Sequence, residues 1–581
     1  MFKPESMSKV DLFILNEKLQ SLTNLLYELK IIQFFDLKKK DFSRYELEDL
    51  NEDSGKLLEL KSTINFLKDY YKKDTKSDIE NPIQYSKELI SKLDKVEKEI
   101  FKLEDLKKRE RVKNNLKVNL KDFESKDLII GYVPKSKKGS LEKLSSNKIK
   151  FRKYESENRI YFLIKTKKEN LKSVNYEEFY IPKSLPNKIQ EKLEKARAQE
   201  IKIKTDLTKL SNSTLRILEI EEARLEKKIK TEEVKRDFLK TENITVLSGY
   251  IPTKKVKLFR RKVEEIVGTK YHMEVEEAKE DAPTKLNNGP VSGNFESLLQ
   301  MYSLPSYKEF DPTKLLLLVF PLFFGFILGD AIYGLVSLFF FMWLSNKMPQ
   351  LKEFMFILQL SSISSIIWGV IYGEFAGFKF FGPFYGVFPR FYMPETLFYV
   401  AVIFGLIHIN LGVLIGFFNN YKKNFAHAVY NHLSYIVLQI GIGAMVVASL
   451  ISESFFYVIG AILIGLALLM IYLGHGFIGI IEVPSFFTNI LSYARLMAVG
   501  LSSVAIAVLI NELTLPLLSS GIIGIIAALI LFSAAHIFNI ILGNFESFLH
   551  TLRLHYVEFF TKFYKGEGKK FTPFGEKIVE E

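Results

Sequence analysis

The stretch Asn489-Ile-Leu-Ser-Tyr-Ala-Arg-Leu-Met-Ala-Val-Gly-Leu-Ser-Ser503 decides how this chain folds. It places the guanidinium of Arg495 inside an apolar run from about Phe486 to Ile510, which is long enough to span a bilayer. A charge there costs roughly 2.5–3.5 kcal/mol on insertion scales, and arginine does not escape this cost by losing its proton. Arg495 lies about nine residues, or roughly 14 Å of helix, from the nearer end of the run, which disfavours snorkelling. We predict a functional arginine in a membrane helix, the alternative being a structural ion pair.

Apolar runs fill the second half of the chain. We predict an α-helical polytopic membrane domain over residues 313–563, with about eight transmembrane helices, followed by a cytoplasmic tail at 564–581. The first two runs are separated only by Asp330 and are alternatively one long helix. The eight runs are 314–329, 331–346, 354–373, 396–417, 427–451, 455–481, 485–510 and 521–560.

The charges of the loops favour a cytoplasmic location for both ends of the chain. With this orientation, the lysines of the loops 346–353 and 418–424 lie inside, whereas Glu453 and Glu512 lie outside. This is the asymmetry of positive-inside loops. The loop 374–394 fits worst, because it contains Lys379 and Arg390.

The last apolar run has a polar stripe. At 100° per residue its four polar members lie within about 60° of one another on a helix; they are Asn539, Glu546, His550 and Arg553. The preceding run has polar residues of its own, namely Thr488, Ser492, Arg495, Ser502 and Ser503. Two facing polar stripes in a membrane predict an ion path. The alternative is interhelical hydrogen bonding plus an Arg553–Glu546 pair.

The first 310 residues are charged and supply the whole formal charge of +13, because acids and bases are equal in number from Asp311 onward. The charges alternate in sign along the predicted helices and form no basic stripe, so we expect no nucleic-acid partner. Solvated faces, an acidic partner or anionic lipid fit better. The N-terminus lacks the apolar core of a signal peptide, so we expect this half to stay on the side where it is made.

Two segments of this half, about 55–120 and 187–240, have apolar residues at heptad spacing, which predicts a narrow seam for a partner helix. We predict that they pair as an antiparallel coiled coil; the alternative is a surface helix on an ordinary globule. The seam residues are Leu89, Leu93, Val96, Ile100 and Leu103 in the first segment, and Ile189, Leu193, Ala196, Ile203, Leu207, Leu210 and Ile217 in the second.

Two small α/β lobes are predicted beside the coil, at about 121–185 and at 241–280 together with the N-terminus. Alternation and composition predict strands at 127–134, 148–152, 159–164 and 244–252, and a helix at 256–267. The tetrapeptides Gly131-Tyr-Val-Pro134 and Gly249-Tyr-Ile-Pro252 resemble an internal repeat. Residues 279–312, rich in turn formers, are expected to link this cytoplasmic arm, residues 1–310, to the membrane domain.

The sequence excludes several kinds of site. Because the chain has no cysteine, it has no disulfide, thiolate zinc site or catalytic thiol, and without a P-loop motif we expect no P-loop nucleotide site. The G-x-G-x-x-G letters of Gly474–Gly479 lie in an apolar run without a βαβ unit and do not indicate dinucleotide binding. The histidine pairs 427/432 and 550/555 are five residues apart, which is wrong for shared metal ligation on one helix. We expect no cofactor, no metal site and no enzymatic active site in this chain.

Three segments resemble the large membrane subunit of V/A-type rotary ATPases, which is subunit I in archaea and bacteria and subunit a in eukaryotes. They are Phe320–Gly334, Asn489–Gly500 and Leu549–Phe559. The resemblance implies a non-catalytic stator in the plasma membrane of an archaeon or bacterium. Its arm would hold peripheral stalks of E/G-type subunits, and its last two helices would lie against a ring of c/K proteolipids. The central-stalk and catalytic subunits would belong to the same complex.

The resemblance also implies roles for two residues: Arg495 resembles the essential arginine of the family and Arg553 its companion. A ring carboxylate opposite a fixed guanidinium favours its charged form and releases its ion. Two half-channels separated by Arg495 would turn this release into directed transport. Eukaryotic members have a histidine where this chain has Ser503, and a glutamate at the position of Gly543, so the archaeal or bacterial type matches better and channel roles for Ser503 and Glu546 are hypotheses.

Two other functions are weighed. A stand-alone secondary ion transporter with a coiled-coil regulatory arm would usually have inverted repeats, and residues 314–417 and 427–560 show no such correspondence. A membrane tether without transport would leave both polar stripes unexplained. The sequence leaves open whether the ion is H⁺ or Na⁺.

Overall fold

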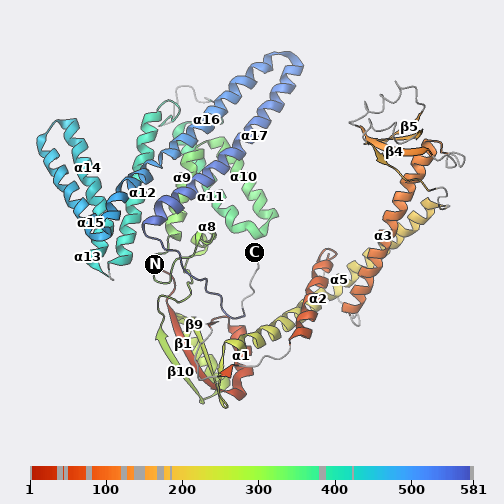
Figure 1. Cartoon of the computed structure of the whole chain (residues 1–581), viewed down its shortest axis with the longest axis horizontal. Coiled ribbons are helices and arrows are strands. Elements are labelled where there is room, and N and C mark those ends of the chain that lie inside the picture. The colour runs from red at the N-terminus through yellow and green to blue at the C-terminus, as the bar shows by residue number, and fades with distance from the viewer. Residues whose placement is uncertain are drawn as a thin grey trace. The chain divides into compact units, whose positions relative to one another are not determined.

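The computed structural model describes residues 3–35, 43–44, 50–72, 82–118, 127–135, 151–156, 158–166, 176–182, 186, 188–378, 388–421 and 424–575. The chain forms two compact units. One consists of Met1–Arg44 with Asp237–Glu581, and the other of Tyr45–Arg236 (Figure 1).

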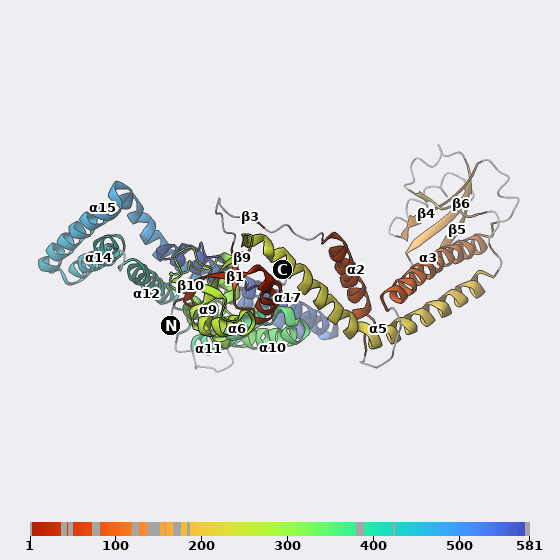
Figure 2. The ribbon, with the colours of Figure 1, turned by 90° about the horizontal axis from the view of Figure 1, so that it is seen from below.

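The unit Tyr45–Arg236 is built on three charged helices, α2 (Asn51–Lys68), α3 (Pro82–Asn115) and α5 (Ile189–Glu233). Helices α3 and α5 run side by side (Figure 2). Two ion pairs show that they are antiparallel, because Arg197 reaches Glu104 at 2.6 Å and Lys204 reaches Glu97 at 3.5 Å. The predicted antiparallel pairing is therefore confirmed. The first predicted segment, 55–120, consists of two helices, α2 and α3, instead of one.

Most of the predicted seam is buried, but the placement of Ile217 in this seam is wrong. Its side chain is 57% exposed, whereas Thr214 and Leu218 are buried and continue the seam. A straight α-helix drifts by about 20° per heptad, so a strict seven-residue count leaves the buried face after several turns. Val96, Ile100 and Ile203 are half-buried. The Thr214 hydroxyl donates to the Leu210 carbonyl, so a polar residue is tolerated in the seam.

A four-stranded antiparallel sheet of order β5-β6-β4-β7 belongs to the same unit. Its strands are β4 (Leu128–Pro134), β5 (Phe151–Glu155), β6 (Arg159–Lys165) and β7 (Glu177–Glu178). The predicted strands at 127–134 and 159–164 are confirmed. The prediction for 148–152 lies mostly outside the described residues.

The other unit begins with a sheet of order β10-β1-β9-β8-β3, in which β2 also pairs with β9. Its strands are β1 (Met7–Leu15), β2 (Gln33–Phe34), β3 (Ser43–Arg44), β8 (Leu239–Lys240), β9 (Ile244–Pro252) and β10 (Tyr271–Glu277), with helices α1 (Leu19–Leu29) and α6 (Val256–Val267). The predicted repeat has a structural counterpart. Gly131 pairs with Glu178 on the short strand β7, and Gly249 pairs with Phe34 on the short strand β2.

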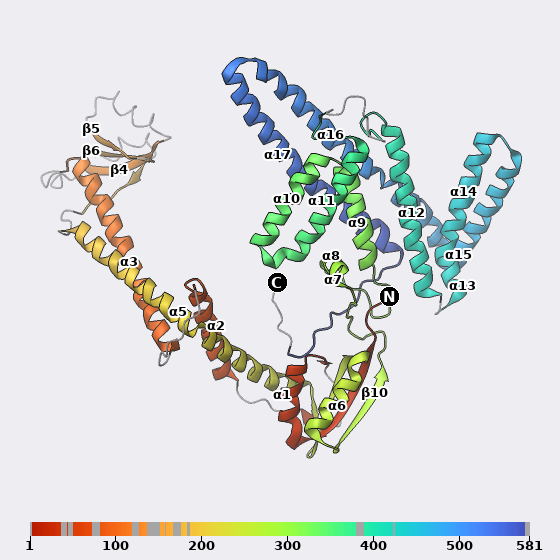
Figure 3. The ribbon, with the colours of Figure 1, turned by 180° about the vertical axis from the view of Figure 1, so that it is seen from behind.

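Apolar helices make up the rest of this unit (Figure 3). They are α9 (Thr313–Leu328), α10 (Ala331–Lys347), α11 (Lys352–Tyr372), α12 (Pro394–Asn420), α13 (Phe425–Ala428), α14 (Ser434–Ile451), α15 (Ser454–Leu491), α16 (Ala494–Thr514) and α17 (Gly521–Arg553). Within the described residues, five helical stretches are long and apolar enough to cross a membrane, and α9 and α10 are shorter. Each predicted run is helical, but eight crossings stay a prediction.

Short helical turns connect or extend these elements. The 3-10 turns are η1 (Asn16–Lys18), η5 (Val234–Asp237), η6 (Thr253–Lys255), η7 (Pro349–Leu351), η9 (Leu515–Ser519) and η11 (Phe560–Lys562). Two π-helical segments are η8 (Val429–Leu433) and η10 (Leu554–Phe559).

Helices α9 and α10 are separate, so the alternative of one long helix is wrong. The Asp330 carboxylate caps α10 by accepting from Tyr333 N at 2.9 Å, and it also accepts from Ala376 N at 2.6 Å. An aspartate at this position satisfies a backbone donor that the helix leaves free.

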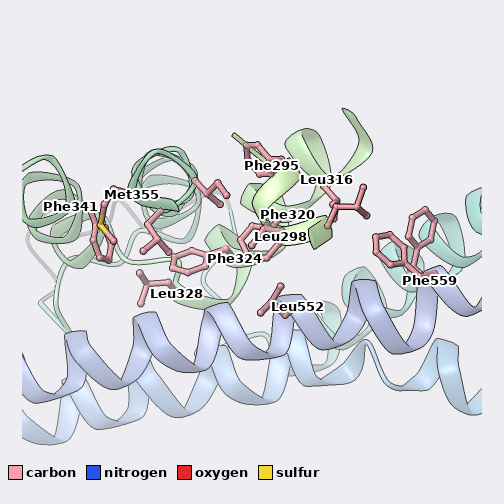
Figure 4. Close-up of a cluster of buried hydrophobic side chains, with 14 of the residues drawn as sticks. Phe295, Leu298, Leu316, Phe320, Phe324, Leu328, Phe341, Met355, Leu552 and Phe559 are labelled. Atoms are coloured by element: carbon pink, nitrogen blue, oxygen red, sulfur yellow. The ribbon is translucent and has the colours of Figure 1, made fainter. Parts of the chain in front are cut away.

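The predicted linker 279–312 is partly helical, with α7 (Pro290–Gly293) and α8 (Glu296–Tyr302). Phe295, Leu298 and Leu299 are fully buried in the core of the apolar helices. Figure 4 shows Phe295 and Leu298 beside Leu316 and Phe320 of α9 in this cluster. The segment is therefore a packed part of the membrane-domain core.

The 66-residue stretch Ser454–Ser519 has two joints. Gly476 has φ +64° and ψ −153°, which kinks α15 where only glycine adopts the backbone conformation without strain. The second joint is Ser492–Tyr493, directly before α16. The predicted boundary between runs, at 481–485, lies between these joints inside continuous helix.

Candidate functional site

Arg495 stands in the first turn of α16, directly after the joint at Ser492–Tyr493. Its guanidinium lies 3.2 Å from Glu558 Oε1 and 3.5 Å from Ser492 Oγ. The side chain is 27% exposed, so one side of the group contacts protein and the other remains accessible. The arginine is thus held at the surface of the apolar helices, and snorkelling to a distant interface is not needed to satisfy it.

Glu558 is the residue that the sequence reasoning missed. Its side chain is 2% exposed, and Oε1 also lies 3.9 Å from Arg553 Nε, so one carboxylate faces both arginines. Residues five apart on an α-helix point about 140° away from each other. The π-helical turn η10 brings residue i+5 back towards residue i, and such turns are frequent at functional sites. A search at α-helical spacing therefore pairs Arg553 with the wrong acid.

Glu546 and His550 lie on α17 and are half-buried. His550 is close enough to Arg495, Arg553 and Glu546 to interact with them electrostatically. Within the described residues Arg553 pairs with Glu558, and no ion pair joins it to Glu546. The structure therefore brings together five of the eight predicted site residues, namely Ser492, Arg495, Glu546, His550 and Arg553.

Asn539 and Ser503 meet at a second, fully buried place between α16 and α17. The Asn539 amide donates to the Ser503 carbonyl at 3.1 Å and to the Tyr333 hydroxyl at 3.0 Å. Tyr333 in turn contacts His536 Nδ1 at 2.7 Å, and His536 Nε2 contacts Asn511 Oδ1 at 3.0 Å.

The direction of these hydrogen bonds follows from Asn511, whose amide group donates to the Ala376 carbonyl at 2.9 Å. Its oxygen therefore accepts from His536 Nε2–H, and neutral His536 accepts from the Tyr333 hydroxyl through Nδ1. Tyr333, His536 and Asn511 therefore each have a defined donor and acceptor in this hydrogen-bond network. The network joins α10, α16 and α17, which is the interhelical hydrogen bonding that was the alternative to an ion path.

Ser502 belongs to neither group. It is exposed, and its hydroxyl donates to the Val499 carbonyl of its own helix. Neighbouring helical residues point about 100° apart, so Ser502 and Ser503 cannot share one face.

Two buried histidines, His408 and His555, pack together at the π-turn η10. His408 Nδ1 of α12 lies 2.7 Å from the Tyr493 hydroxyl, and its ring stacks on Phe559 with centroids 3.9 Å apart. The His555 ring lies 5.0 Å from that of His408. Tyr493 lies two positions before Arg495, and His555 lies two positions after Arg553. This closeness in sequence to an arginine in an apolar run is the signal that could have indicated them.

The outer faces of α16 and α17 are apolar and exposed. The side chains are Ile506, Leu509, Leu513, Ile537, Phe538, Ile541, Phe545 and Leu549. An apolar surface of this extent needs lipid or a partner protein to cover it.

A family model for the V-type ATPase 116 kDa subunit family matches residues 172–395 and 475–575, together more than half of the chain. The chain belongs to this family. Arg495, Arg553 and Glu558 all lie in the second matched segment, and Asp330 lies in the first. Membership makes the chain a component of a rotary ATPase complex rather than an enzyme by itself.

Individual relatives agree. The A-type ATP synthase subunit I of Methanocaldococcus jannaschii is 27% identical over 698 aligned positions, covering 98% of this chain and 99% of that protein. The same subunit of Methanothermobacter thermautotrophicus is 32% identical over 355 positions, covering 58% of this chain and 52% of that protein. A crystal structure of the cytoplasmic N-terminal domain of a V-ATPase subunit I covers 46% of this chain and 100% of that one, with 14% identity and a TM-score of 0.25, too low to bear on the fold.

Proposed function

We propose that this chain is the membrane-embedded stator subunit of an archaeal or bacterial A/V-type ATP synthase, with both ends in the cytoplasm. It forms two ion half-channels against a ring of proteolipids, and its arm anchors E/G-type peripheral stalks. The observation behind this proposal is the pair Arg495 and Arg553, two guanidiniums from neighbouring apolar helices that meet at one buried carboxylate. Both arginine side chains remain partly exposed.

This arrangement fits an encounter with a carboxylate on another chain. A ring carboxylate that arrives from lipid is neutral, because it holds a proton or an ion. Beside the accessible guanidinium of Arg495 its charged form is favoured, and the ion leaves. The half-buried Glu546 and His550 are proposed to line the half-channel that receives it, with Ser492 beside the arginine.

The deeper pair, Asn539 and Ser503, is proposed to close the space between the two half-channels. Both amide hydrogens of Asn539 are engaged within the protein, so this place is occupied by fixed polar side chains. Ser502 lies on the exposed face of α16, where a channel role depends on the neighbouring ring.

The test is Arg495→Gln in the assembled complex. We expect normal assembly and loss of ATP-driven ion uptake into membrane vesicles, because glutamine keeps hydrogen-bonding capacity but removes the charge that discharges the ring carboxylate. A matched control is Arg261→Gln on the exposed helix α6, whose side chain is largely in solvent. Coupled transport at the normal rate in Arg495→Gln would refute the proposed function.

A further inference from the structure

Glu558 has an unusual position between the two arginines. The Glu558 side chain is 2% exposed, whereas the side chains of Arg495 and Arg553 are 27% and 54% exposed. A buried carboxylate costs free energy unless a close cation offsets the loss of water, so Glu558 depends on these arginines. Here the acid lies beneath the cations, and the cations face outward.

We infer that Glu558 is a positioning residue that balances the charge of the two guanidiniums, so that an arriving carboxylate meets one unpaired positive charge instead of two. This inference rests on the proposed function. Both arginines are permanently charged, and their attraction for a carboxylate is large where water is scarce. Glu558 supplies the only fully buried negative charge that contacts either of them among the described residues.

The other charged or titratable groups near this point do not replace Glu558. Glu546 and His550 on α17 are half-buried, and among the described residues neither forms an ion pair with both arginines as Glu558 does. Lys562 of η11 interacts electrostatically with Glu482 and Glu558. It adds a positive charge near the carboxylate and cannot take over the role of Glu558. The buried Tyr493 also faces Glu558 and is neutral as a phenol.

The position of the acid has a consequence for release. Glu558 uses Oε1 for both arginines, and its Oε2 has no hydrogen-bond partner among the described residues. An arriving carboxylate and Glu558 would therefore compete for the same guanidinium from opposite sides. When the ring turns onward, Arg495 returns to Glu558 and is not left unpaired, which lowers the cost of letting the ring carboxylate go.

The decisive variant is Glu558→Gln in the assembled complex, with ATP-driven uptake of protons followed by a pH-sensitive dye and uptake of sodium followed by radioactive sodium. We expect transport to fall roughly tenfold, as for the loss of one charge-assisted hydrogen bond. The double variant Glu558→Gln with Arg553→Gln restores one net positive charge and should transport faster than Glu558→Gln alone. A residue that merely holds helices together would give no such recovery.

Three outcomes overturn the inference. They are a normal transport rate in Glu558→Gln, a double variant no faster than Glu558→Gln, and loss of assembly in both, which would mean that the carboxylate only builds the helix bundle. Assembly of the double variant but not of Glu558→Gln supports it. Ser519→Ala is the control, because this exposed hydroxyl donates to the Pro516 carbonyl of its own helical turn and lies outside the proposed site. Arg495→Gln distinguishes failure of the proposed function from failure of this inference. If Arg495→Gln abolishes transport while Glu558→Gln transports normally, only the inference about Glu558 fails.

Discussion

Arg390 shows how one residue misleads a rule that counts charges. The loop 374–394 fitted the positive-inside pattern worst because Arg390 was counted as a loop charge. In the structure Arg390 is buried, and it pairs with Glu374 at 2.6 Å. It also donates to the carbonyls of Ile327 at 2.7 Å and Leu328 at 3.0 Å, which are free at the end of α9. A charge neutralised inside the protein does not report on loop topology, whereas Lys379 lies outside the described residues.

Substitution of Arg390 should be among the most damaging single changes in this unit. Arg390→Gln leaves Glu374 buried without its partner and frees the carbonyls at the end of α9, so we expect a loss of about 3–5 kcal/mol of stability. Glu374→Gln should cost less, because the carbonyl bonds of Arg390 remain. Thermal unfolding of the purified protein in detergent compares the two. Equal losses would mean that the contacts with α9 contribute nothing.

At the scale of elements, periodicity predicted the regular parts and failed where the helix period changes. The helix at 256–267 and the strand at 244–252 are confirmed, because their patterns are local. Ile217 was placed in the seam by a strict heptad, and Glu558 was passed over by a strict α-helical count. A π-turn leaves no mark in hydrophobic spacing, so the contact of Glu558 with Arg495 is seen only in the structure.

Close packing of α10 and α11 gives a prediction for a pair of glycines. A Cβ added at Gly369 of α11 would lie 2.2 Å from Ala331 N and 2.6 Å from Asp330 C, which are backbone atoms. Gly369→Ala should therefore force α10 and α11 apart and cost about 1–3 kcal/mol. Gly443→Ala on α14 is the matched control, because among the described residues no neighbouring side chain or helix lies within 4 Å of an added Cβ, and alanine favours a helix. Melting of the purified protein checks both, and equal melting temperatures would contradict this packing.

At the scale of the whole chain, the segments that join the elements were the least predictable. Residues 279–312 and the tail from 564 onward were expected as linker and tail, since turn residues and charge are typical of both. Instead Thr284 pairs with residues 569–571, donating to the Lys569 carbonyl at 2.7 Å and accepting from Phe571 N at 3.0 Å. Phe574 N donates to the Ile32 carbonyl at 2.7 Å. Contacts between residues several hundred positions apart have no local sequence signal.

These contacts predict that the end of the chain holds the linker against the N-terminal sheet. Phe571 is buried with Met7, Tyr250, Ala278 and Tyr307, so Phe571→Ala removes the one aromatic ring that the tail contributes to this cluster. We expect faster amide hydrogen exchange in residues 279–309 and in β1, because local opening becomes easier when apolar contacts are lost. Thr572→Ala, next to it and exposed, should leave the exchange unchanged.

The α3–α5 pair provides an internal reference in the same experiment, because it belongs to the other compact unit and has its own apolar contacts. Its exchange should not respond to Phe571→Ala. Faster exchange in both units would mean that the substitution unfolds the protein generally. Unchanged exchange in residues 279–309 would mean that the tail rests on the sheet without stabilising it. Only a selective response assigns the tail a mechanical role: it would fasten the first strand of the chain to the helices that contain Arg495, the connection a stator needs to resist the torque of a turning ring.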